Sequence, residues 1–361
     1  MALDRITLSR FRNHADTALD GARGFNLLVG ENGAGKTNVL EAISLLAPGR
    51  GLRRAALPEM ASDQGQGGFA VGASLAQHDG GEPVRLGTYT EAQAPSRRRV
   101  RVNGSEASAV SLGEWLAMGW LTPAMDRLFM DSAGARRRFL DRMALAFDPS
   151  HARHATRYES ALRERNRLLA DERPLDPAWL DGIEVQLAEH GAALSQGRIA
   201  TLGVLSTALE ILPEEPFARP LLDYDSGGPT DCADLAAALR DGRKRERSAG
   251  RTLTGPHRAD LAVTMAGKAM PAANCSTGEQ KAMLIAIVLA HAELAAKGRP
   301  GVLLLDEVAA HLDPLRRAAL FDRLRSSGAQ VWLTGTELAP FADIREEAAV
   351  WEVACGAVTR M

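Results

Sequence analysis

The stretch VGENGAGKTNVLEAI, from Val29 to Ile43, decides the class of fold to which the rest of the chain must conform. It fits the spacing G-x-x-x-x-G-K-[ST], in which glycines allow a tight turn whose backbone N–H groups point inward at phosphates. We expect Lys36 to reach the outer phosphates of ATP and Thr37 to bind Mg²⁺. The residues expected to contact the nucleotide here are Gly30, Glu31, Asn32, Gly33, Ala34, Gly35, Lys36 and Thr37.

The residues on either side of this loop have the pattern of a buried strand followed by a helix. Residues 25–29, FNLLV, form a compact apolar run, and residues 38–46 carry apolar side chains at helical spacing. A helix that starts at a phosphate loop turns its positive end toward the anion. The alternative is a chance match in a Gly-rich turn, which the flanking strand and helix disfavour.

A second motif, VLLLDE at 302–307, is a hydrophobic run that ends with two carboxylates. Ligands bind at the carboxyl ends of the strands in an open α/β sheet, so both side chains are expected there. Asp306 would bind Mg²⁺, and Glu307 would orient or deprotonate the attacking water. The alternative is that the pair only caps the next helix.

Residues 276–280, STGEQ, precede an apolar helical run from Lys281 to Ala295. They resemble the signature motif of the ABC and SMC-type ATPases, which contacts the γ-phosphate bound by a second subunit. We therefore expect Ser276, Gly278 and Glu279 to contact a nucleotide in this way. The alternative is an ordinary S-x-x-E capping box, and both can hold, because capping geometry leaves N–H groups free for an anion.

The triplet HLD at 311–313 resembles the D-loop of the same superfamily, which places Asp313 at the dimer interface. Spacing then separates the branches of the superfamily. Ser276 follows Lys36 by 240 residues, and Asp306 follows Ser276 by 30. A transporter domain has a much shorter first interval, and an SMC protein has hundreds of coiled-coil residues there.

Several longer stretches are similar to the RecF family of bacterial recombination mediator ATPases. They are LSRFRNHADTAL (8–19), FNLLVGENGAGKTNVLEAISLLAPGR (25–50), RRRFLDRM (136–143), RERNRLL (163–169), LTGPHRADL (253–261) and STGEQKAMLIAIVLAHAEL (276–294). The phosphate loop and signature are shared across the superfamily, whereas GPHRADL together with RRRFLD and RERNRLL is much more specific.

This resemblance implies a homodimer that closes around two ATP and Mg²⁺ sites and holds duplex DNA or a single-strand/duplex gap junction. Slow, DNA-stimulated hydrolysis would drive release, and RecO and RecR would be partners in loading a recombinase during replication, repair and the SOS response. It also places Arg12 and Asn13 on the nucleotide side of the first strand.

The resemblance implies an α/β head of the ABC/SMC type, with a mixed sheet and an antiparallel layer, interrupted by a mainly helical lobe. We expect the head to comprise residues 1–120 and 250–361 and the lobe to comprise residues 121–249. Residues 66–104 indicate antiparallel strands, with a two-residue hairpin at Asn103-Gly104. Residues 223–234 are rich in Gly, Pro and Asp, which predicts a loop.

The overall composition is that of an ordinary globular protein. Any surface that binds nucleic acid must therefore be a local cluster of charge. The 361 residues are 45% hydrophobic and carry a net charge of −2, so overall charge does not favour a polyanionic partner. Three cysteines far apart favour a reducing compartment. No signal peptide or membrane span is visible, so a cytoplasmic location without membrane partners is expected.

Two clusters of basic residues are candidate DNA contacts. Residues 240–258 hold seven basic and two acidic side chains, and residues 96–101, SRRRVR, hold four arginines. Neutralised phosphates release counterions, which favours such clusters. A solvated face in an arginine-rich chain is an equal alternative, because only five of the 43 basic residues are lysine.

Two positions depart from superfamily patterns. The segment TGTE at 334–337 has threonines where transporters have a switch histidine, which favours the RecF family. Ala124 stands where an acidic residue is expected, with Asp126 nearby. Two other functions remain open: an ABC-type ATPase that does not act on DNA, and a DNA clamp with negligible turnover.

Overall fold

The computed structural model describes residues 3–62, 67–76, 81–171, 177–213, 215–296 and 298–361. The chain forms two compact units, of which the first comprises residues 1–126 and 284–361 and the second comprises residues 127–283. The described helices include none that is both long and apolar enough to cross a membrane.

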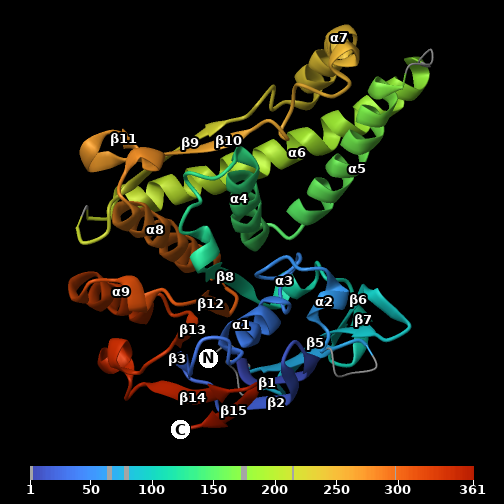
Figure 1. The fold of residues 1–361 in the computed structure, drawn as a ribbon. Helices are drawn as coiled ribbons and strands as arrows, with labels where there is room; N and C mark the ends of the chain where they lie inside the picture. Colours follow the sequence, from blue (N-terminus) through green and yellow to red (C-terminus); the bar gives the residue numbers. More distant parts are fainter. Residues whose placement is uncertain (1–2, 63–66, 77–80, 172–176, 214, 297) are drawn as a thin grey trace. The chain divides into compact units, whose positions relative to one another are not determined.

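The first unit contains a mixed sheet whose central strands are fully buried (Figure 1). Five of the strands described here run parallel, and the edge strand β15 is antiparallel. Trp332 and Trp351 stack on this sheet with ring centroids 5.3 Å apart. In spatial order the strands are β15 (Ala357–Arg360), β14 (Ala348–Ala354), β3 (Phe25–Val29), β13 (Gln330–Gly335), β12 (Gly301–Leu305) and β8 (Ala117–Leu121).

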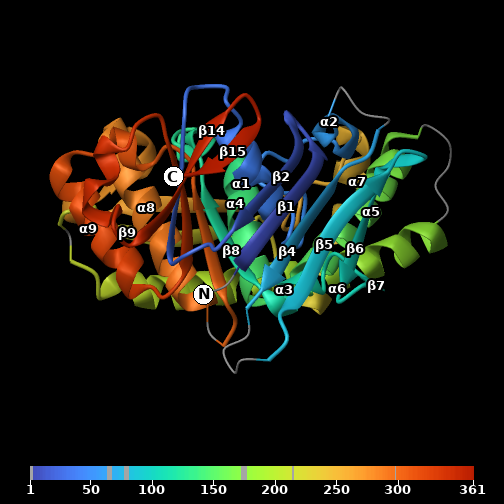
Figure 2. The same ribbon diagram turned by 90° about the horizontal axis from the view of Figure 1, so that it is seen from below.

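An antiparallel sheet forms the other layer of the first unit, and its strands lie side by side in Figure 2. The expected hairpin is confirmed: Val102 pairs with Ser105, and Asn103 and Gly104 both have positive φ, as a two-residue turn of this kind requires. In spatial order the strands are β2 (His14–Asp20), β1 (Leu3–Phe11), β4 (Ala70–Leu75), β5 (Val84–Glu91), β6 (Ala94–Val102) and β7 (Ser105–Ala107).

Two helices of the first unit begin at motifs identified in the sequence. The phosphate loop opens into α1, and α9 begins at Pro314 with Asp313 as its N-cap. The bounds are α1 (Lys36–Ser44), α2 (Leu57–Met60), α3 (Leu112–Trp115) and α9 (Pro314–Ser326), with short 3-10 turns η1 (Pro123–Met125), η4 (Ala309–His311) and η5 (Ala339–Ile344).

The second unit is mainly helical, as expected, and carries a small antiparallel sheet. In Figure 1, α5 and α6 lie side by side, and α7 packs on α6. The bounds are α4 (Ala133–Phe147), α5 (His151–Ala170), α6 (Pro177–Glu210), α7 (Cys232–Ala249), β9 (Pro220–Asp225), β10 (Asp260–Met265), β11 (Met270–Pro271), η2 (Ala266–Lys268) and η3 (Ala272–Asn274). Helix α8 (Thr277–Ala295) starts in this unit and ends in the first.

The bounds of the units differ from the lobes expected from the sequence. The inserted unit comprises residues 127–283 instead of 121–249, and it includes β10, which pairs along its whole length with β9. The loop expected at 223–234 is also shorter than predicted. Strand β9 continues to Asp225, and Asp231 caps α7 by accepting the N–H groups of Ala233 and Asp234 at 2.8 and 3.3 Å.

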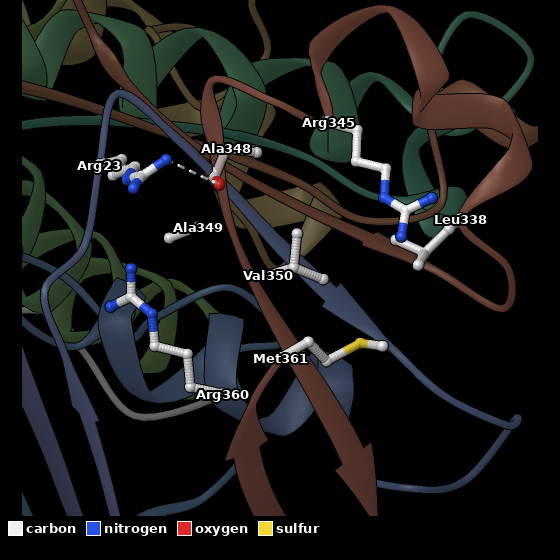
Figure 3. Close-up of a pocket in the computed structure, with 8 residues that line it drawn as sticks. All are labelled: Arg23, Leu338, Arg345, Ala348, Ala349, Val350, Arg360 and Met361. Carbon is white, nitrogen blue, oxygen red and sulfur yellow. Dashed lines mark hydrogen bonds between the residues drawn. The ribbon is translucent and has the colours of Figure 1, made fainter.

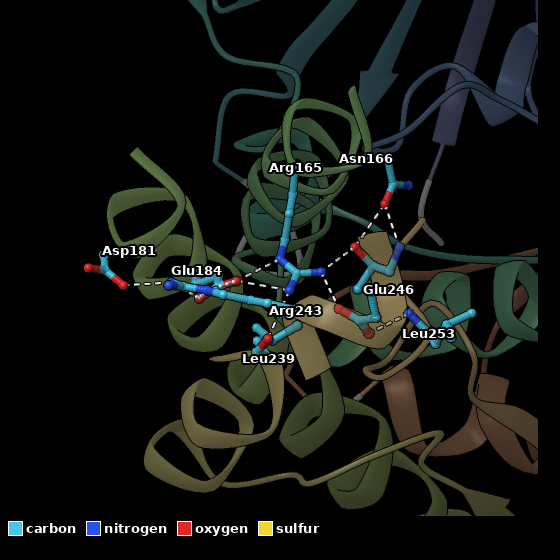
Figure 4. A network of polar contacts seen from close by, with 9 residues as sticks. Arg165, Asn166, Asp181, Glu184, Leu239, Arg243, Glu246 and Leu253 are labelled. Atoms are coloured by element: carbon cyan, nitrogen blue, oxygen red, sulfur yellow. Dashed lines mark hydrogen bonds and ion pairs between the residues drawn. The ribbon is translucent and has the colours of Figure 1, made fainter. Parts of the chain in front are cut away.

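A buried arginine joins three helical segments of the second unit (Figure 4). Arg165 on α5 donates to Glu184 on α6, to Glu246 on α7 and to Thr252 just after α7. It also donates to the carbonyl of Leu239, so all five of its N–H donors are used. Glu184 additionally accepts from Arg243, which lies within the basic run 240–258.

Replacement of Arg165 by methionine should destabilise the second unit by about 3–5 kcal/mol, because the buried Glu246 carboxylate loses its only ion-pair partner among the described residues. Urea unfolding followed by circular dichroism measures this loss. The matched control is Arg163→Met on the exposed face of the same helix, which should stay within about 0.5 kcal/mol of the parent. Equal stability of both variants would contradict the structural role given to Arg165.

Candidate nucleotide-binding site

The phosphate loop is held from behind by the turn after β1. Asn13 donates its side-chain N–H to the carbonyl of Ala34 at 2.9 Å, and His14 Nε2 donates to the carbonyl of Gly35 at 3.1 Å. Gly35 has φ +118°, and a Cβ added there would lie within 2.8 Å of both side chains. Only glycine therefore fits this close approach. His14 is buried, and burial lowers its pKa, which keeps the ring neutral.

Lys36 folds back over the loop that carries it. Its Nζ donates to the carbonyls of Gly30 and Glu31 at 2.7 and 2.8 Å. Burial lowers the pKa of Lys36, whereas the carboxylates of Glu307 and Asp306 act in the opposite direction. The two acidic residues expected at the sheet edge thus act electrostatically on the lysine of the phosphate loop.

Asp306 is the centre of the polar contacts at the carboxyl ends of β12 and β13. Its carboxylate accepts the hydroxyl of Thr37 at 2.9 Å and the hydroxyl of Thr334 at 2.8 Å. Burial raises its pKa, and these two hydrogen bonds counteract part of that shift. Hydroxyl and carboxylate oxygens are hard donors of the kind that Mg²⁺ prefers, so Thr37 and Asp306 fit a magnesium ion beside bound phosphates.

Glu307 follows Asp306 in a backbone conformation that is rare for a residue with a Cβ. Its φ is +54°, which costs about 1–2 kcal/mol for an L-residue. Its N–H donates to the hydroxyl of Thr334 at 2.9 Å, and this contact helps to hold the turn. Strained conformations of this kind persist where the surroundings fix them, which is common at functional sites.

Arg12 contacts the helix that follows the phosphate loop. Its guanidinium makes a bidentate pair with Glu41 on α1, with both distances 2.9 Å, and Nη1 donates to the carbonyl of Glu59. Arg53 shares the same Glu41 carboxylate, which is fully buried. Arg12 therefore supports the helix that follows the phosphate loop, and of the FRN motif it is Asn13 that contacts the loop itself.

Sequence reasoning missed three residues of this arrangement. His14 follows Asn13 directly, and Glu41 lies one helical turn after Thr37, so both had a local signal. From the sequence, Thr334 indicates only that a switch histidine is absent. Nothing in its sequence context indicated that its buried hydroxyl would contact both Asp306 and Glu307.

The signature residues form the capping box that the sequence allowed. The N–H and hydroxyl of Ser276 both donate to Glu279 Oε2 at 2.9 Å, and α8 begins at Thr277, so Gly278 lies in its first turn. Lys268 donates to the other carboxylate oxygen of Glu279. This ion-pair hydrogen bond, with help from Ser276, lowers the pKa of Glu279 to about 2, so Glu279 stays ionised at neutral pH.

Asp313 also has a capping role. It is the N-cap of α9, where its Oδ1 accepts the N–H of Arg316 at 2.9 Å. Ala124, at the place where an acidic residue is expected, is exposed in the 3-10 turn η1.

Comparison with known proteins identifies the family of the chain. Residues 2–353 match the family described as RecF/RecN/SMC N terminal domain. A curated protein of Mesorhizobium japonicum, "DNA replication and repair protein RecF", is 47% identical, with 99% of this chain and 97% of that protein covered. The chain belongs to the RecF family.

Solved structures agree with this family assignment at the level of the fold. A structure of the recombination mediator protein RecF-ATP has a TM-score of 0.86 at 24% identity and covers 100% of this chain and 97% of that one. An Smc head domain from Pyrococcus furiosus has a TM-score of 0.55 at 16% identity and covers 100% and 96%. The expected ABC/SMC-type head with a mainly helical insertion is confirmed.

The basic run at 96–101 is mostly engaged within the fold. Arg98 donates to Thr88 and to carbonyls after α1, including Gly49 and Ala47, and burial lowers its pKa to about 10. Arg99 pairs with Glu91 and Glu106. Arg101 lies over the ring of Tyr89 with its guanidinium carbon 5.1 Å from the centroid. These contacts favour the structural interpretation of this run over a DNA contact.

A cavity of about 320 Å³ lies at another place in the first unit (Figure 3). Arg23, Arg345 and Arg360 line it together with apolar side chains of β14 and Met361 at the chain end. None of its lining residues belongs to the phosphate loop or the Asp306 cluster. It therefore lies apart from the candidate nucleotide site around Lys36 and Thr37.

Replacement of Thr334 by valine should weaken Mg²⁺ binding in the presence of ATP about 10- to 100-fold, because Asp306 loses the hydroxyl that holds it in place. Affinity for ATP in the presence of a chelator should not change. Fluorescence of a nucleotide analogue titrated with Mg²⁺ measures both quantities.

Two further variants control this experiment. Thr334→Ser keeps the hydroxyl and should restore Mg²⁺ binding, and Thr336→Val alters an exposed threonine of the same segment and should have no effect. Unchanged Mg²⁺ affinity in Thr334→Val would show that Asp306 does not depend on this contact.

Proposed function

We propose that this chain is an ATP-dependent DNA-binding protein of DNA replication and recombinational repair. The observation that carries this proposal is the contact of Asp306 with Thr37 and Thr334, which joins the phosphate loop to the acidic strand end. The name of the curated RecF relatives, DNA replication and repair protein, and the RecF-ATP structure support the same assignment.

In this proposal, hydrolysis acts as a switch. Lys36 binds the outer phosphates, Thr37 and Asp306 hold Mg²⁺, and Glu307 orients the attacking water or takes its proton. The ion supplies charge neutralisation at the phosphates when it is bound. The turnover is slow, because the chemistry serves to time release of DNA and not to supply mechanical work.

The proposed working form is a homodimer with two nucleotides at its interface. Ser276, Gly278 and Glu279 of one copy complete the site formed by the phosphate loop of the other, and Asp313 lies at the same interface. The capping box supports this arrangement, because a helix N-terminus with a fixed first turn offers N–H groups to a phosphate.

Duplex DNA and single-strand/duplex gap junctions are the proposed DNA substrates. RecO and RecR are proposed partners in loading a recombinase, and the description of the ATP-bound structure as part of the RecFOR pathway supports this proposal. The cytoplasm is the proposed compartment.

A second candidate is an ATPase of the same fold that does not act on DNA. Arginines that bind groups of the protein favour this candidate. Arg98 and Arg243 make such contacts, so each basic cluster has fewer cations available for DNA. This candidate predicts ATP-dependent dimers that ignore DNA.

Glu307→Gln should trap the ATP-bound dimer and prolong DNA binding at least about tenfold, because the amide cannot accept the proton of the attacking water. Size-exclusion chromatography with ATP and a gapped duplex, followed by dissociation kinetics on the same DNA, tests both effects. The matched control is Glu337→Gln, an exposed glutamate that should not alter either property. A variant that neither dimerises nor changes DNA lifetime would rule out the switch.

A further inference from the structure

The loop GPHRAD at 255–260 is the meeting point of segments far apart in the sequence. Arg136 on α4 makes a bidentate pair with Asp260, with both distances 2.7 Å. The next residue, Arg137, donates to the carbonyl of Ala259. The C-terminal half of the loop is therefore fixed to α4 through both a side chain and the backbone.

The N-terminal half of the loop is fixed to α6. Arg198 donates to the carbonyl of Pro256 at 2.8 Å while Nε and Nη2 bind Asp141 at 2.7 and 3.0 Å. Asp141 also contacts Nε2 of the buried His151 at 3.0 Å. Arg198 is itself buried, so the carbonyl of Pro256 is held by a side chain with little freedom to move.

His257 is held on both of its ring nitrogens. Tyr158 on α5 donates its hydroxyl to Nδ1 at 2.7 Å, and Nε2 donates to the carbonyl of Thr252 at 3.1 Å. Burial lowers the pKa of His257 and raises the pKa of Tyr158. The histidine is therefore a neutral structural group.

Glycines let a second loop pack against the first at backbone distance. Gly227 has φ +67°, and a Cβ there would lie 2.5 Å from the N atom of Ala259. Gly255 has φ +128°, and its Cβ would lie 2.7 Å from the hydroxyl of Tyr158. The loop at 255–260 is thus enclosed on several sides by closely packed groups that have little room to move.

Arg258 is different from every neighbour in this loop. Its side chain is exposed, and the described part of the structure gives its guanidinium no hydrogen bond or ion pair. His257, Ala259 and Asp260 are all engaged within the protein. A loop held at so many points presents one arginine to solvent with the backbone already ordered, which reduces the entropy lost when a ligand binds.

We propose that Arg258 binds a phosphate of the DNA backbone. Arg258 is the last residue of the basic run at 240–258, and exposed Arg138 follows Arg137, the residue that holds the loop. An added Cβ on Gly134 would lie 3.3 Å from Arg138 Nη1 and 3.6 Å from Arg137 Nη2, so both guanidinia lie at the start of α4. A guanidinium fork on a backbone that is already ordered suits a phosphate group, and the arginines at the start of α4 add positive charge within the same unit.

This inference rests on the proposed DNA binding and assigns one residue to it. The test measures fluorescence anisotropy of a labelled gapped duplex with the full chain, ATP and Mg²⁺ over a series of salt concentrations. Arg258→Ala should weaken binding on the order of tenfold near 0.1 M salt and reduce the salt slope by about one for each copy of Arg258 in contact. Arg258→Lys keeps the charge and should retain the slope.

The controls separate the possible failures. Arg163→Ala removes an exposed arginine of α5 outside the loop and should leave the slope unchanged, and circular dichroism checks that each variant is folded. ATP-dependent dimerisation of Arg258→Ala should equal that of the parent. Loss of the dimer would assign Arg258 to the nucleotide and overturn the proposal, as would parental DNA affinity in this variant. A parent chain that binds no DNA would instead overturn the proposed function.

Discussion

The carboxylate of Asp306 is held by hydroxyls that come from two distant parts of the chain, Thr37 at the start of α1 and Thr334 at the end of β13. A buried carboxylate without such partners would be costly, so β3, β12 and β13 must keep their register for the site to exist. Parallel pairing of β13 with both neighbours provides that register. The nucleotide site therefore depends on the sheet at its base.

Arginine has several distinct roles in this protein, and the contacts separate them. Arg165 and Arg198 are buried, and each joins acidic side chains to backbone carbonyls in the second unit. Arg98 binds carbonyls beyond the end of α1. Because a guanidinium has five donors in a rigid fork, it can hold several acceptors at once where lysine could not. Local charge in the sequence is consequently a poor measure of charge available to DNA.

Much of the fold could be predicted because its signals are local. The strand at 25–29, the helix after the phosphate loop, the hairpin at Asn103-Gly104 and the capping box at Ser276 each depend on residues adjacent in the sequence. The differences from the expected bounds are of another kind. The extent of β9 and the limit of the inserted unit depend on pairing with β10, which lies 35 residues later in the chain at the pair Asp260↔Asp225 and therefore gives less local signal.

The sequence by itself determined the family resemblance and predicted a nucleotide site built from Lys36, Thr37, Asp306 and Glu307, because both are carried by residue type and spacing. Only the tertiary structure decided which polar residues act together. In the structure Arg12 binds Glu41, and Thr334 binds Asp306. His257 binds Tyr158, whereas Arg258 is exposed. The physical reason is that a hydrogen bond is satisfied by geometry in space, and its partners can lie anywhere along the chain.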